Sequence, residues 1–334
     1  MTFECEAALR FRDQTNQTMK HLISIALFAI ASIATVKAQY NKTNLSLLES
    51  AGSTESKYRY EKLQLYPVRA NQAFLNQHQN LANYVTLKEA LASKKIAITE
   101  KSTQGTVNTL LIENVSKDTV IVLSGEVIQG GKQDRVIAED IILYPNSGKK
   151  DIPVFCVEHG RWSARGGDRS FNQYFDISSN EVRKAATVKK DQREVWQKVA
   201  ETNQKHNTQT RTGTLAAIKS SSELNEEVKN YAEHFRKLLL DDPDVIGVVA
   251  VSVTTILGCD MFANHDIFGK YLPNLLNSYA TEAVTSGGTP SVSYQQVRKY
   301  LDSIIDNENK QEEEVKKKGA VLKDGTKKVH ISTF

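Results

Sequence analysis

The sequence predicts an α+β protein in which an antiparallel, β-rich N-terminal half packs with a helix-rich C-terminal half. Short β-branched runs dominate the chain up to Trp162, and apolar residues at helical spacing dominate after it. The strand-like runs are joined by short polar connections, which antiparallel neighbours allow and parallel crossovers do not. Strands followed by helices, without strict alternation, favour α+β over a doubly wound sheet.

The first strands are expected in the N-terminal half. Residues 58–75 predict a strand broken at Pro67, because proline lacks the backbone donor that a ladder needs. Residues 96–99 alternate apolar and polar side chains and predict a strand. Residues 108–114 and 119–123 are two β-rich runs joined by a short polar link, and they predict a hairpin.

Two more strands are predicted at residues 135–144 and 151–157. Residues 145–148, with the sequence Pro-Asn-Ser-Gly, predict a turn between them, because Pro fixes φ while Asn and Gly tolerate positive φ. Residues 163–175 are rich in Gly and Arg and predict a loop.

Helical patterns follow. Ser178 and Glu181 match a capping box and predict the start of a helix. Residues 222–240 repeat apolar side chains at helical spacing and predict an amphipathic helix. Residues 245–253 form an almost continuous apolar strand, and residues 256–262 are expected to pair with it as a hairpin.

The C-terminal part of the sequence predicts two helices and a hairpin. Residues 267–284 predict a helix that Pro273 kinks or restarts, and residues 293–305 predict another helix. Residues 321–331 predict a closing hairpin that turns at Asp324-Gly325.

The N-terminus predicts export. Residues 19–38 read as a signal peptide, with a basic start, an apolar run and a small-x-small site at Ala38. Residues 1–18 then precede the true translation start, residues 39–57 form a flexible leader, and residues 58–334 form a single domain. The expected location is periplasmic or extracellular, with no stable membrane span after cleavage. The alternative is an uncleaved anchor, although the apolar run is short for a full span.

Composition excludes several classes of protein. Of 334 residues, 40% are hydrophobic and 25% charged, which is ordinary for a globular chain. A net charge of +4 gives no electrostatic argument for nucleic acid. The predicted mature chain retains only Cys156 and Cys259, which make no disulfide framework. Two separate buried thiols are expected, and a bond between these two cysteines is the alternative.

The signature segment, residues 123–162, combines glycines, charges and an aromatic side chain more densely than any other stretch. Its two clusters are Gly125, Glu126, Gly130, Gly131, Lys132, Gln133, Asp134 and Arg135, and Cys156, Glu158, His159, Gly160, Arg161 and Trp162. The pair Gly130-Gly131 either makes a tight turn or presents backbone amides to an anion beside Lys132 and Arg135. A P-loop is excluded, because Gly131 precedes Lys132 and Gln133 stands where a hydroxyl residue is needed.

Glu158 is the candidate catalytic residue. It follows an apolar strand and needs a partner, for which Arg161 and Arg135 are the natural choices. One interpretation is a structural salt bridge with Trp162 packed over it. The other makes Glu158 a general base, with the arginines holding phosphate or carboxylate. Cys156 is a poor nucleophile candidate, because an apolar strand raises a thiol pKa.

These patterns support three hypotheses. The first is a module that binds a small anionic or sugar-phosphate ligand where residues 130–135 meet residues 158–162, with Asp260 and Phe262 near the same corner. The second is a hydrolase that uses Glu158 as base, and the third is a structural or envelope-interaction protein. HExxH and CxxC patterns are absent, so no metal site is assigned, and a ligand set of Cys156, Glu158 or His159 with a distant His265 or His330 is the alternative. The sequence identifies no cofactor. The expected ligand-binding residues are Glu126, Lys132, Gln133, Arg135, His159, Arg161 and Trp162.

The signature segment resembles the bacterial ADP-ribosylglycohydrolase- and rhodanese-phosphatase-associated domain family. The resemblance extends from about Tyr58 to the C-terminus. It rests on residues 125–135 and 152–162, with further matches at Val195-Trp196 and at residues 247–249, 257–262, 272–280 and 329–334. His159 departs from the Gln that is usual in the family, so imidazole chemistry there is not a family property. The resemblance implies no reaction, and its name implies ADP-ribose and phosphate chemistry only by association.

Overall fold

The computed structural model describes residues 39–53, 55–163, 167–306 and 308–334. The predicted early start and signal peptide, residues 1–38, lie outside the described residues. Gln39–Phe334 forms one compact unit. Two of its sheets come from the N-terminal half, its largest sheet combines strands of both halves, and its long helices come from the C-terminal half, so the predicted α+β class is confirmed.

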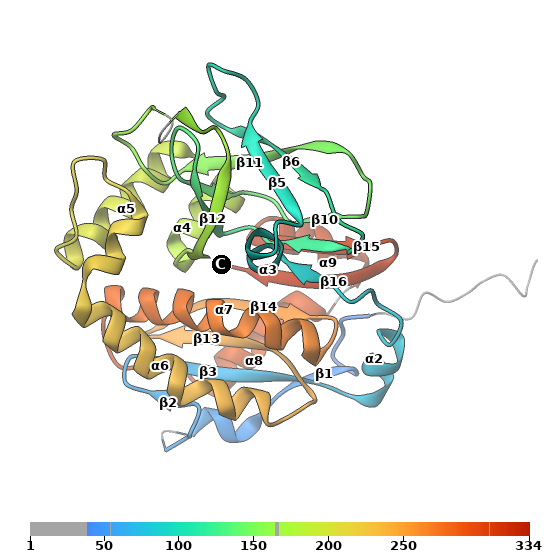
Figure 1. Cartoon of the computed structure of the whole chain (residues 1–334). Helices are drawn as coiled ribbons and strands as arrows, with labels where there is room; N and C mark the ends of the chain where they lie inside the picture. Colours follow the sequence, from blue (N-terminus) through green and yellow to red (C-terminus); the bar gives the residue numbers. More distant parts are fainter. Residues whose placement is uncertain (1–38, 54, 164–166, 307) are drawn as a thin grey trace, which may run out of the picture. The chain divides into compact units, whose positions relative to one another are not determined.

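The largest sheet combines strands from both ends of the described chain (Figure 1). Its order is β1-β3-β13-β14-β16-β15, with β2 paired to β3, and its pairings are antiparallel. The predicted C-terminal hairpins are therefore confirmed. The strands are β1 (Leu45–Leu47), β2 (Arg59–Tyr60), β3 (Leu63–Ala70), β13 (Val245–Ser252), β14 (Thr255–Phe262), β15 (Gly319–Asp324) and β16 (Lys327–Thr333).

The predicted break at Pro67 is wrong. β3 continues through Pro67, which is the register partner of Val248 on β13. The Pro67 carbonyl also accepts a hydrogen bond from the Leu48 amide at 3.1 Å. Proline removes one donor but its φ suits an extended chain, so pairing on both sides of Pro67 carries the strand across it.

Two further sheets contain the remaining strands. One has the order β10-β7-β4 and the other β12-β8-β9-β11-β6-β5. The β4–β7 pair is parallel. The strands are β4 (Val85–Thr86), β5 (Ile96–Glu100), β6 (Thr109–Asn114), β7 (Val120–Val122), β8 (Glu126–Gly130), β9 (Arg135–Ile137), β10 (Ile141–Leu143), β11 (Lys149–Cys156) and β12 (Phe171–Ile177).

The predicted hairpin of residues 108–114 and 119–123 is also wrong. β6 pairs with β5 and β11, whereas β7 pairs with β10 and β4, so the short link joins two sheets. The buried Asn114 side chain redirects the chain at this point. Its amide donates to the Asp118 carbonyl at 2.7 Å and to the Leu143 carbonyl at 2.9 Å. The first bond closes the link between β6 and β7, and the second ties this link to β10 of the other sheet.

Two predictions around residue 178 need correction. The C-terminal part of the predicted loop 163–175 belongs to β12, which pairs with β8 through two register shifts. The predicted capping box does not form, because the next helix has Ser179 as its N-cap and no side-chain cap bond there. Instead, Ser178 Oγ donates to the Gly125 carbonyl, and the Glu181 amide donates to Glu282 Oε2 at 3.2 Å.

Helices α6 and α7 lie side by side across one face of the largest sheet, and α8 lies on the other face (Figure 1). The α7 helix runs through Pro273 without a restart. The helices are α2 (Gln72–Gln77), α3 (Leu87–Ala92), α4 (Asn180–Lys184), α5 (Gln192–Lys205), α6 (Ser222–Leu240), α7 (His265–Ser286), α8 (Tyr294–Ile305) and α9 (Glu308–Lys316). Shorter helical turns are η1 (Glu49–Gly52), η3 (Ala185–Lys189) and η4 (Leu215–Ser220).

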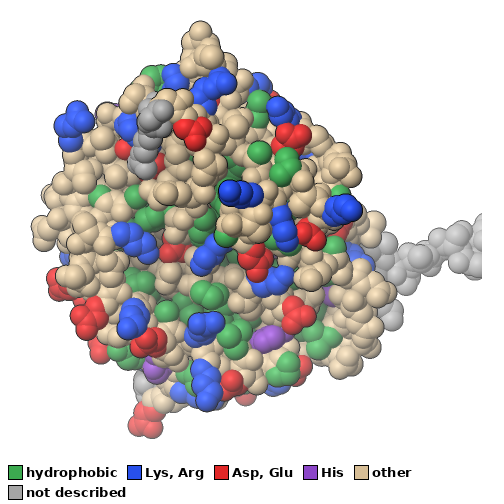
Figure 2. Space-filling model, in the orientation of Figure 1, with side chains coloured by type: hydrophobic (Ala, Val, Ile, Leu, Met, Phe, Trp, Pro, Cys, Tyr) green, Lys and Arg blue, Asp and Glu red, His purple; other side chains and the backbone are tan. Residues whose placement is uncertain are grey.

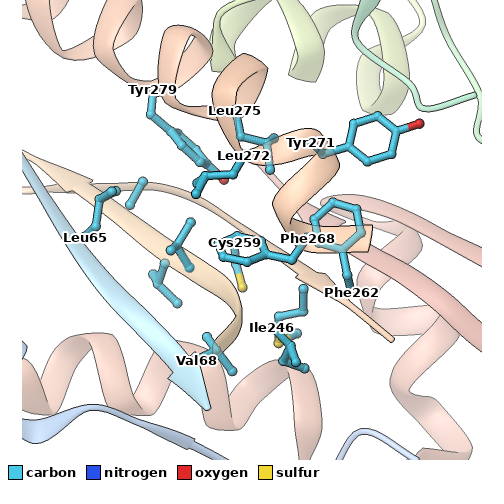
Figure 3. Packing of buried hydrophobic residues seen from close by; sticks show 14 of the residues in the cluster. Leu65, Val68, Ile246, Cys259, Phe262, Phe268, Tyr271, Leu272, Leu275 and Tyr279 are labelled. Atoms are coloured by element: carbon cyan, nitrogen blue, oxygen red, sulfur yellow. The ribbon is translucent and has the colours of Figure 1, made fainter. Parts of the chain in front are cut away.

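The main hydrophobic core lies between the largest sheet and these helices. Figure 3 shows Phe268, Leu272 and Leu275 of α7 packed over Leu65 of β3 and Cys259 of β14. Every residue of β13 is buried, because helices cover both faces of the sheet at this strand. Cys156 and Cys259 are both buried and unbonded, as predicted. Within the described ranges, none of the helices is long and apolar enough to cross a membrane.

Candidate functional site

The structure brings residues 130–135 and 158–162 together, and we call this meeting point the signature corner. Arg161 lies at its centre. Its Nε donates to Glu158 Oε2 at 2.9 Å, and its Nη2 lies 3.2 Å from Asp134 Oδ1. Its Nη1 donates to the carbonyls of Gly131 at 2.7 Å and Ser163 at 2.9 Å. The guanidinium group is therefore occupied by acceptors from the protein itself.

Glu158 and Asp134 are buried carboxylates, with exposed fractions of 2% and 0%. Burial alone would raise the pKa of Glu158, but the hydrogen bond and charge of Arg161 lower it below its ordinary value. Asp134 Oδ2 accepts from Gln129 and from Thr214, each at 3.2 Å. The corner thus joins β8, β11 and the chain before η4 through charged hydrogen bonds.

Trp162 covers the cationic side of the signature corner. Arg135 is fully buried, and its Nη1 donates to the Gln133 carbonyl at 2.9 Å. The centroid of the Trp162 ring lies 5.8 Å from Arg135 Cζ and 5.3 Å from Lys132 Nζ. These are cation–π contacts, and they hold the indole over the corner although it remains 46% exposed.

Gln133 and His159 complete the corner. The Gln133 amide donates to the His159 carbonyl at 3.2 Å. The His159 ring is exposed and meets Trp196 of α5 edge-on, with ring centroids 4.4 Å apart. Six of the seven expected ligand-binding residues, together with Glu158, therefore lie at one corner.

Glu126 is the exception, because it lies at the opposite end of β8 from Gly130. Its Oε2 accepts from the Leu123 amide at 2.7 Å. Burial raises its pKa to about 8. Asp260 and Phe262 also lie away from the corner, in the core at this other end of β8, where Phe262 stacks on the His330 ring.

A second charged group, which we call the buried ion network, contains Arg183, Asp260, His330 and Asp140. Arg183 donates twice to Asp260, at 2.9 and 2.8 Å. His330 lies between two carboxylates, with Nε2 2.9 Å from Asp260 and Nδ1 3.1 Å from Asp140. Tyr279 also donates to Asp260. Arg183, Asp260 and His330 are fully buried, so this network is a structural feature of the core.

The network changes the ionisation of its members. Burial opposes the charged form of Asp260, but Arg183 and His330 hold the pKa of this carboxyl far below its usual range. Asp140 and Asp260 together raise the pKa of His330 despite the opposing effect of burial. The charges of the network therefore compensate each other inside the core.

Cys156 lies beside the signature corner on β11. Burial raises the pKa of its thiol to about 11, so the thiol stays protonated at neutral pH. Because the thiolate is the nucleophile, this environment suits a structural residue.

A cleft that sequence reasoning missed, the first cleft, lies among β12, η4, α6 and α7. Its volume is about 440 Å³. Its walls are mainly apolar, and two amides, two lysines, one carboxylate and four hydroxyl residues line the rest. The lining residues are Phe175, Asp176, Ile177, Ser178, Ser179, Thr202, Leu215, Ile218, Lys219, Leu224, Asn225, Val228, Lys229, Ala232, Asn277 and Thr281.

Asp176 is the buried carboxylate of the first cleft, with an exposed fraction of 6%. Its Oδ1 accepts from Asn274 of α7 at 2.6 Å, and its Oδ2 accepts from Asn277 at 2.9 Å. Lys219 Nζ lies 3.7 Å from Oδ2 and 5.4 Å from the centroid of the Phe175 ring. The two amides fix the carboxylate in place, while Lys219 is half exposed at the mouth.

Little in the local sequence indicates this cleft, because residues 163–175 were expected to be a loop. Asp176 approaches Lys219 and Asn277 only when β12, η4 and α7 pack together. One local signal is Asp176 itself. It stands between Phe175 and Ile177, in a buried strand that favours apolar side chains.

Within the parts of the chain that the structure describes, no group of three or more His, Cys, Asp or Glu side chains could hold a metal ion. Figure 2 shows Lys and Arg side chains interspersed with Asp and Glu over the visible face.

Comparison with known proteins identifies a family. The family model of the ARG and Rhodanese-Phosphatase-superfamily-associated Protein domain matches residues 53–332. No curated protein and no solved structure matches the chain. The matched range includes the signature corner, the buried ion network and the first cleft. The chain therefore belongs to the ARG and Rhodanese-Phosphatase-superfamily-associated Protein domain family.

Proposed function

We propose that this protein is a binding module for a small sugar-phosphate ligand and that the ligand occupies the first cleft. The observation that carries the proposal is the buried Asp176 carboxylate, which Asn274 and Asn277 orient within a cleft of apolar walls. Ligand sites of this kind combine apolar walls with a few placed polar groups.

The chemistry of the lining favours a hydroxylated and anionic ligand. An ionised carboxylate accepts hydrogen bonds and suits sugar hydroxyls, as acidic residues do for ribose in dinucleotide sites. Lys219 and Lys229 at the cleft supply cations for a phosphate group. The Phe175 ring and the aliphatic walls can pack against the C–H faces of a sugar ring.

The signature corner supports this function by holding the fold. The donors of the Arg161 guanidinium group bind Glu158, Asp134 and backbone carbonyls of the protein itself. The lowered pKa of Glu158 suits an ion-pair partner better than a general base that works near neutral pH. The geometry therefore favours a structural role for this corner over the hydrolase hypothesis.

Thermal shift of the wild type with glucose 6-phosphate, fructose 6-phosphate and ribose 5-phosphate tests the proposal. A ligand at a hundredfold excess over its dissociation constant adds about 2.7 kcal/mol to stability, so the melting temperature should rise by several degrees. Lys219→Ala should lose most of this shift, because the substitution removes a cation at the cleft and leaves the core unchanged.

Lys237→Ala is the matched control, because this exposed lysine lies on α6 outside the first cleft. It should keep the full shift. No shift of the wild type with any of the three phosphates, or equal shifts in both lysine variants, would contradict the proposed function.

A further inference from the structure

The six-stranded sheet closes on itself to form a small barrel. Its end strands β5 and β12 meet at Thr99 and Ser170, which are bridge partners. Beside them, the Glu100 amide donates to the Arg169 carbonyl at 3.0 Å. Each of the six strands contributes at least one buried apolar side chain to a single cluster. Because side chains alternate between the two faces of a strand, this cluster marks the interior of the barrel.

Three interior positions at one mouth of the barrel are not aliphatic or aromatic. Arg135 lies two residues before Ile137 of β9, and Glu100 lies two residues after Ile98 of β5, so both side chains face the interior. Cys156 of β11 is the register partner of Arg135. Arg135 is fully buried, and the exposed fraction of Glu100 is 3%. This mouth therefore holds a buried charged pair at a position where β-barrels often bind ligands.

Arg135 differs from Arg161, because part of its guanidinium group has no acceptor. Its Nη1 donates to the Gln133 carbonyl, whereas Nε and Nη2 make no hydrogen bond to any residue that the structure describes. Nη2 lies 3.6 Å from Glu100 Oε1, which is an ion-pair distance but too long for a hydrogen bond. Nε and Nη2 share one edge of the planar group, and such an edge matches two oxygens of an oxyanion.

Glu100 adds an acceptor beside these donors. Its Oε1 accepts from the Lys132 amide at 2.9 Å, whereas its Oε2 is buried and has no donor within the described ranges. Unpaired buried donors and acceptors cost free energy. A ligand that accepts from Arg135 and donates to Glu100 would satisfy both side chains at once.

Trp162 covers this mouth from outside. It is 46% exposed, and cation–π contacts with Arg135 and Lys132 hold its ring. Rotamer changes of exposed side chains take place within nanoseconds. Rotation of this one side chain therefore gives a small ion a path to the edge of Arg135, and Lys132 supplies a further cation at the rim.

The charges around the mouth limit which ion fits. Three cations face three carboxylates, so the surroundings are neutral as a whole. They are Lys132, Arg135 and Arg161, and Glu100, Asp134 and Glu158. A dianion without a proton would add two uncompensated charges and place an acceptor against Glu100 Oε2. An oxyanion that keeps a proton adds less charge and offers a hydroxyl group to this carboxylate.

We propose that this mouth binds inorganic phosphate in a protonated form. Two phosphate oxygens accept from Nε and Nη2 of Arg135, and a P–OH group donates to Glu100 Oε2. Sulfate has the same shape but carries no proton at neutral pH, so it would set an unprotonated oxygen against Glu100. The site is separate from the first cleft and does not depend on the proposed function.

Calorimetric titration of the full chain with sodium phosphate and with sodium sulfate tests this inference. At neutral pH, phosphate should bind at least about tenfold more tightly than sulfate. Lys219→Ala removes the cation of the first cleft and should keep this phosphate affinity. Absence of phosphate binding by the wild type, equal affinities for the two ions, or loss of phosphate binding in Lys219→Ala would each overturn the inference.

Glu100→Gln tests the basis of the selectivity. Oε1 of the new amide can keep the bond from the Lys132 amide, so Nε2 replaces Oε2 and presents a donor to the ion. Sulfate should then bind at least about tenfold more tightly than it does to the wild type. Glu113→Gln makes the same change on the outer face of β6 and should keep the wild-type selectivity.

Circular dichroism checks that Glu100→Gln is folded. Unchanged sulfate affinity in the folded variant, or an equal gain in Glu113→Gln, would contradict the proposed site. Lys132→Gln provides a second test at a half-buried rim position, and it should weaken phosphate binding severalfold. Phosphate affinity equal to that of the wild type in Lys132→Gln would also overturn the inference, whether or not Glu100→Gln folds.

Discussion

Glu126 is a carboxylic acid kept away from water at the start of β8. Its exposed fraction is 0%, and burial raises its pKa to about 8. At neutral pH the folded protein therefore favours the protonated form, whereas an unfolded chain ionises this group above about pH 4.5. Because the folded state binds the extra proton between these two values, stability falls as the pH rises through this window.

Glu126→Gln should remove this pH dependence, because the amide stays neutral and can still accept from the Leu123 amide. As the pH rises from 5 to 8 the wild type loses stability, so the free energy of unfolding of the variant should come to exceed that of the wild type by on the order of 1–4 kcal/mol. Urea unfolding at several pH values measures the difference. Glu313→Gln, at an exposed position on α9, should follow the wild-type profile. Parallel profiles for wild type and Glu126→Gln would refute the assignment.

At the scale of elements, close approach of backbone decides how β8 meets β12. Gly130 has a φ of +144°, and a Cβ atom there would lie 2.3 Å from the Ser170 carbonyl oxygen. Gly131 has a φ of +44°, and its Cβ would meet the Phe171 ring at 2.4 Å. Both glycines are therefore needed for packing and for backbone conformation. Their carbonyls also accept from Arg161, so the same turn builds the signature corner.

Gly130→Ala should destabilise the protein by about 3–5 kcal/mol, because a methyl group meets backbone atoms that cannot move without breaking the β8–β12 pairing. Chemical denaturation measures the loss. Gly148→Ala is the matched control, since Gly148 has a φ of +68° and a Cβ atom there would meet nothing within 4 Å. It should cost only about 1–2 kcal/mol from the backbone conformation. Similar losses for the two variants would show that contact with β12 does not matter.

At the scale of the whole unit, the buried ion network ties together elements distant in sequence. Asp140 precedes β10, Asp260 lies on β14, His330 on β16 and Arg183 on α4. The Arg183 side chain packs directly against Gly125, where a Cβ atom would lie only 2.6 Å from Arg183 Cγ. The network therefore connects the largest sheet to the signature segment through hydrogen-bonded charges, in addition to the apolar contacts of the main core.

Arg183→Met should cost about 3–5 kcal/mol, because it leaves Asp260 buried without its cation. Fluorescence and circular dichroism during urea unfolding measure this loss. Arg193→Met changes a side chain that is 91% exposed and should stay within about 0.5 kcal/mol of the wild type. A loss below about 1 kcal/mol for Arg183→Met would show that the network contributes little to stability.

The sequence by itself determined the elements that local patterns specify. Helix α6 occupies the predicted residues 222–240, because apolar spacing fixes one face of an isolated helix. The β13–β14 and β15–β16 hairpins follow from neighbouring strands and turn residues. The α+β class and the meeting of residues 130–135 with residues 158–162 also followed from the sequence. Each of these features depends on residues close together in the chain or on recognisable motifs.

Only the tertiary structure decided strand partners, charge partners and clefts. β6 and β7 entered different sheets, and β3 continued through Pro67, because their partners come from distant segments. Asp260 was expected near the signature corner, but it binds Arg183 in the core. Asp176 became a cleft residue because α7 and η4 pack against β12. The physical reason is common to all of them. The free energy of a buried polar group or a strand edge depends on neighbours that folding brings together, and local sequence does not contain them.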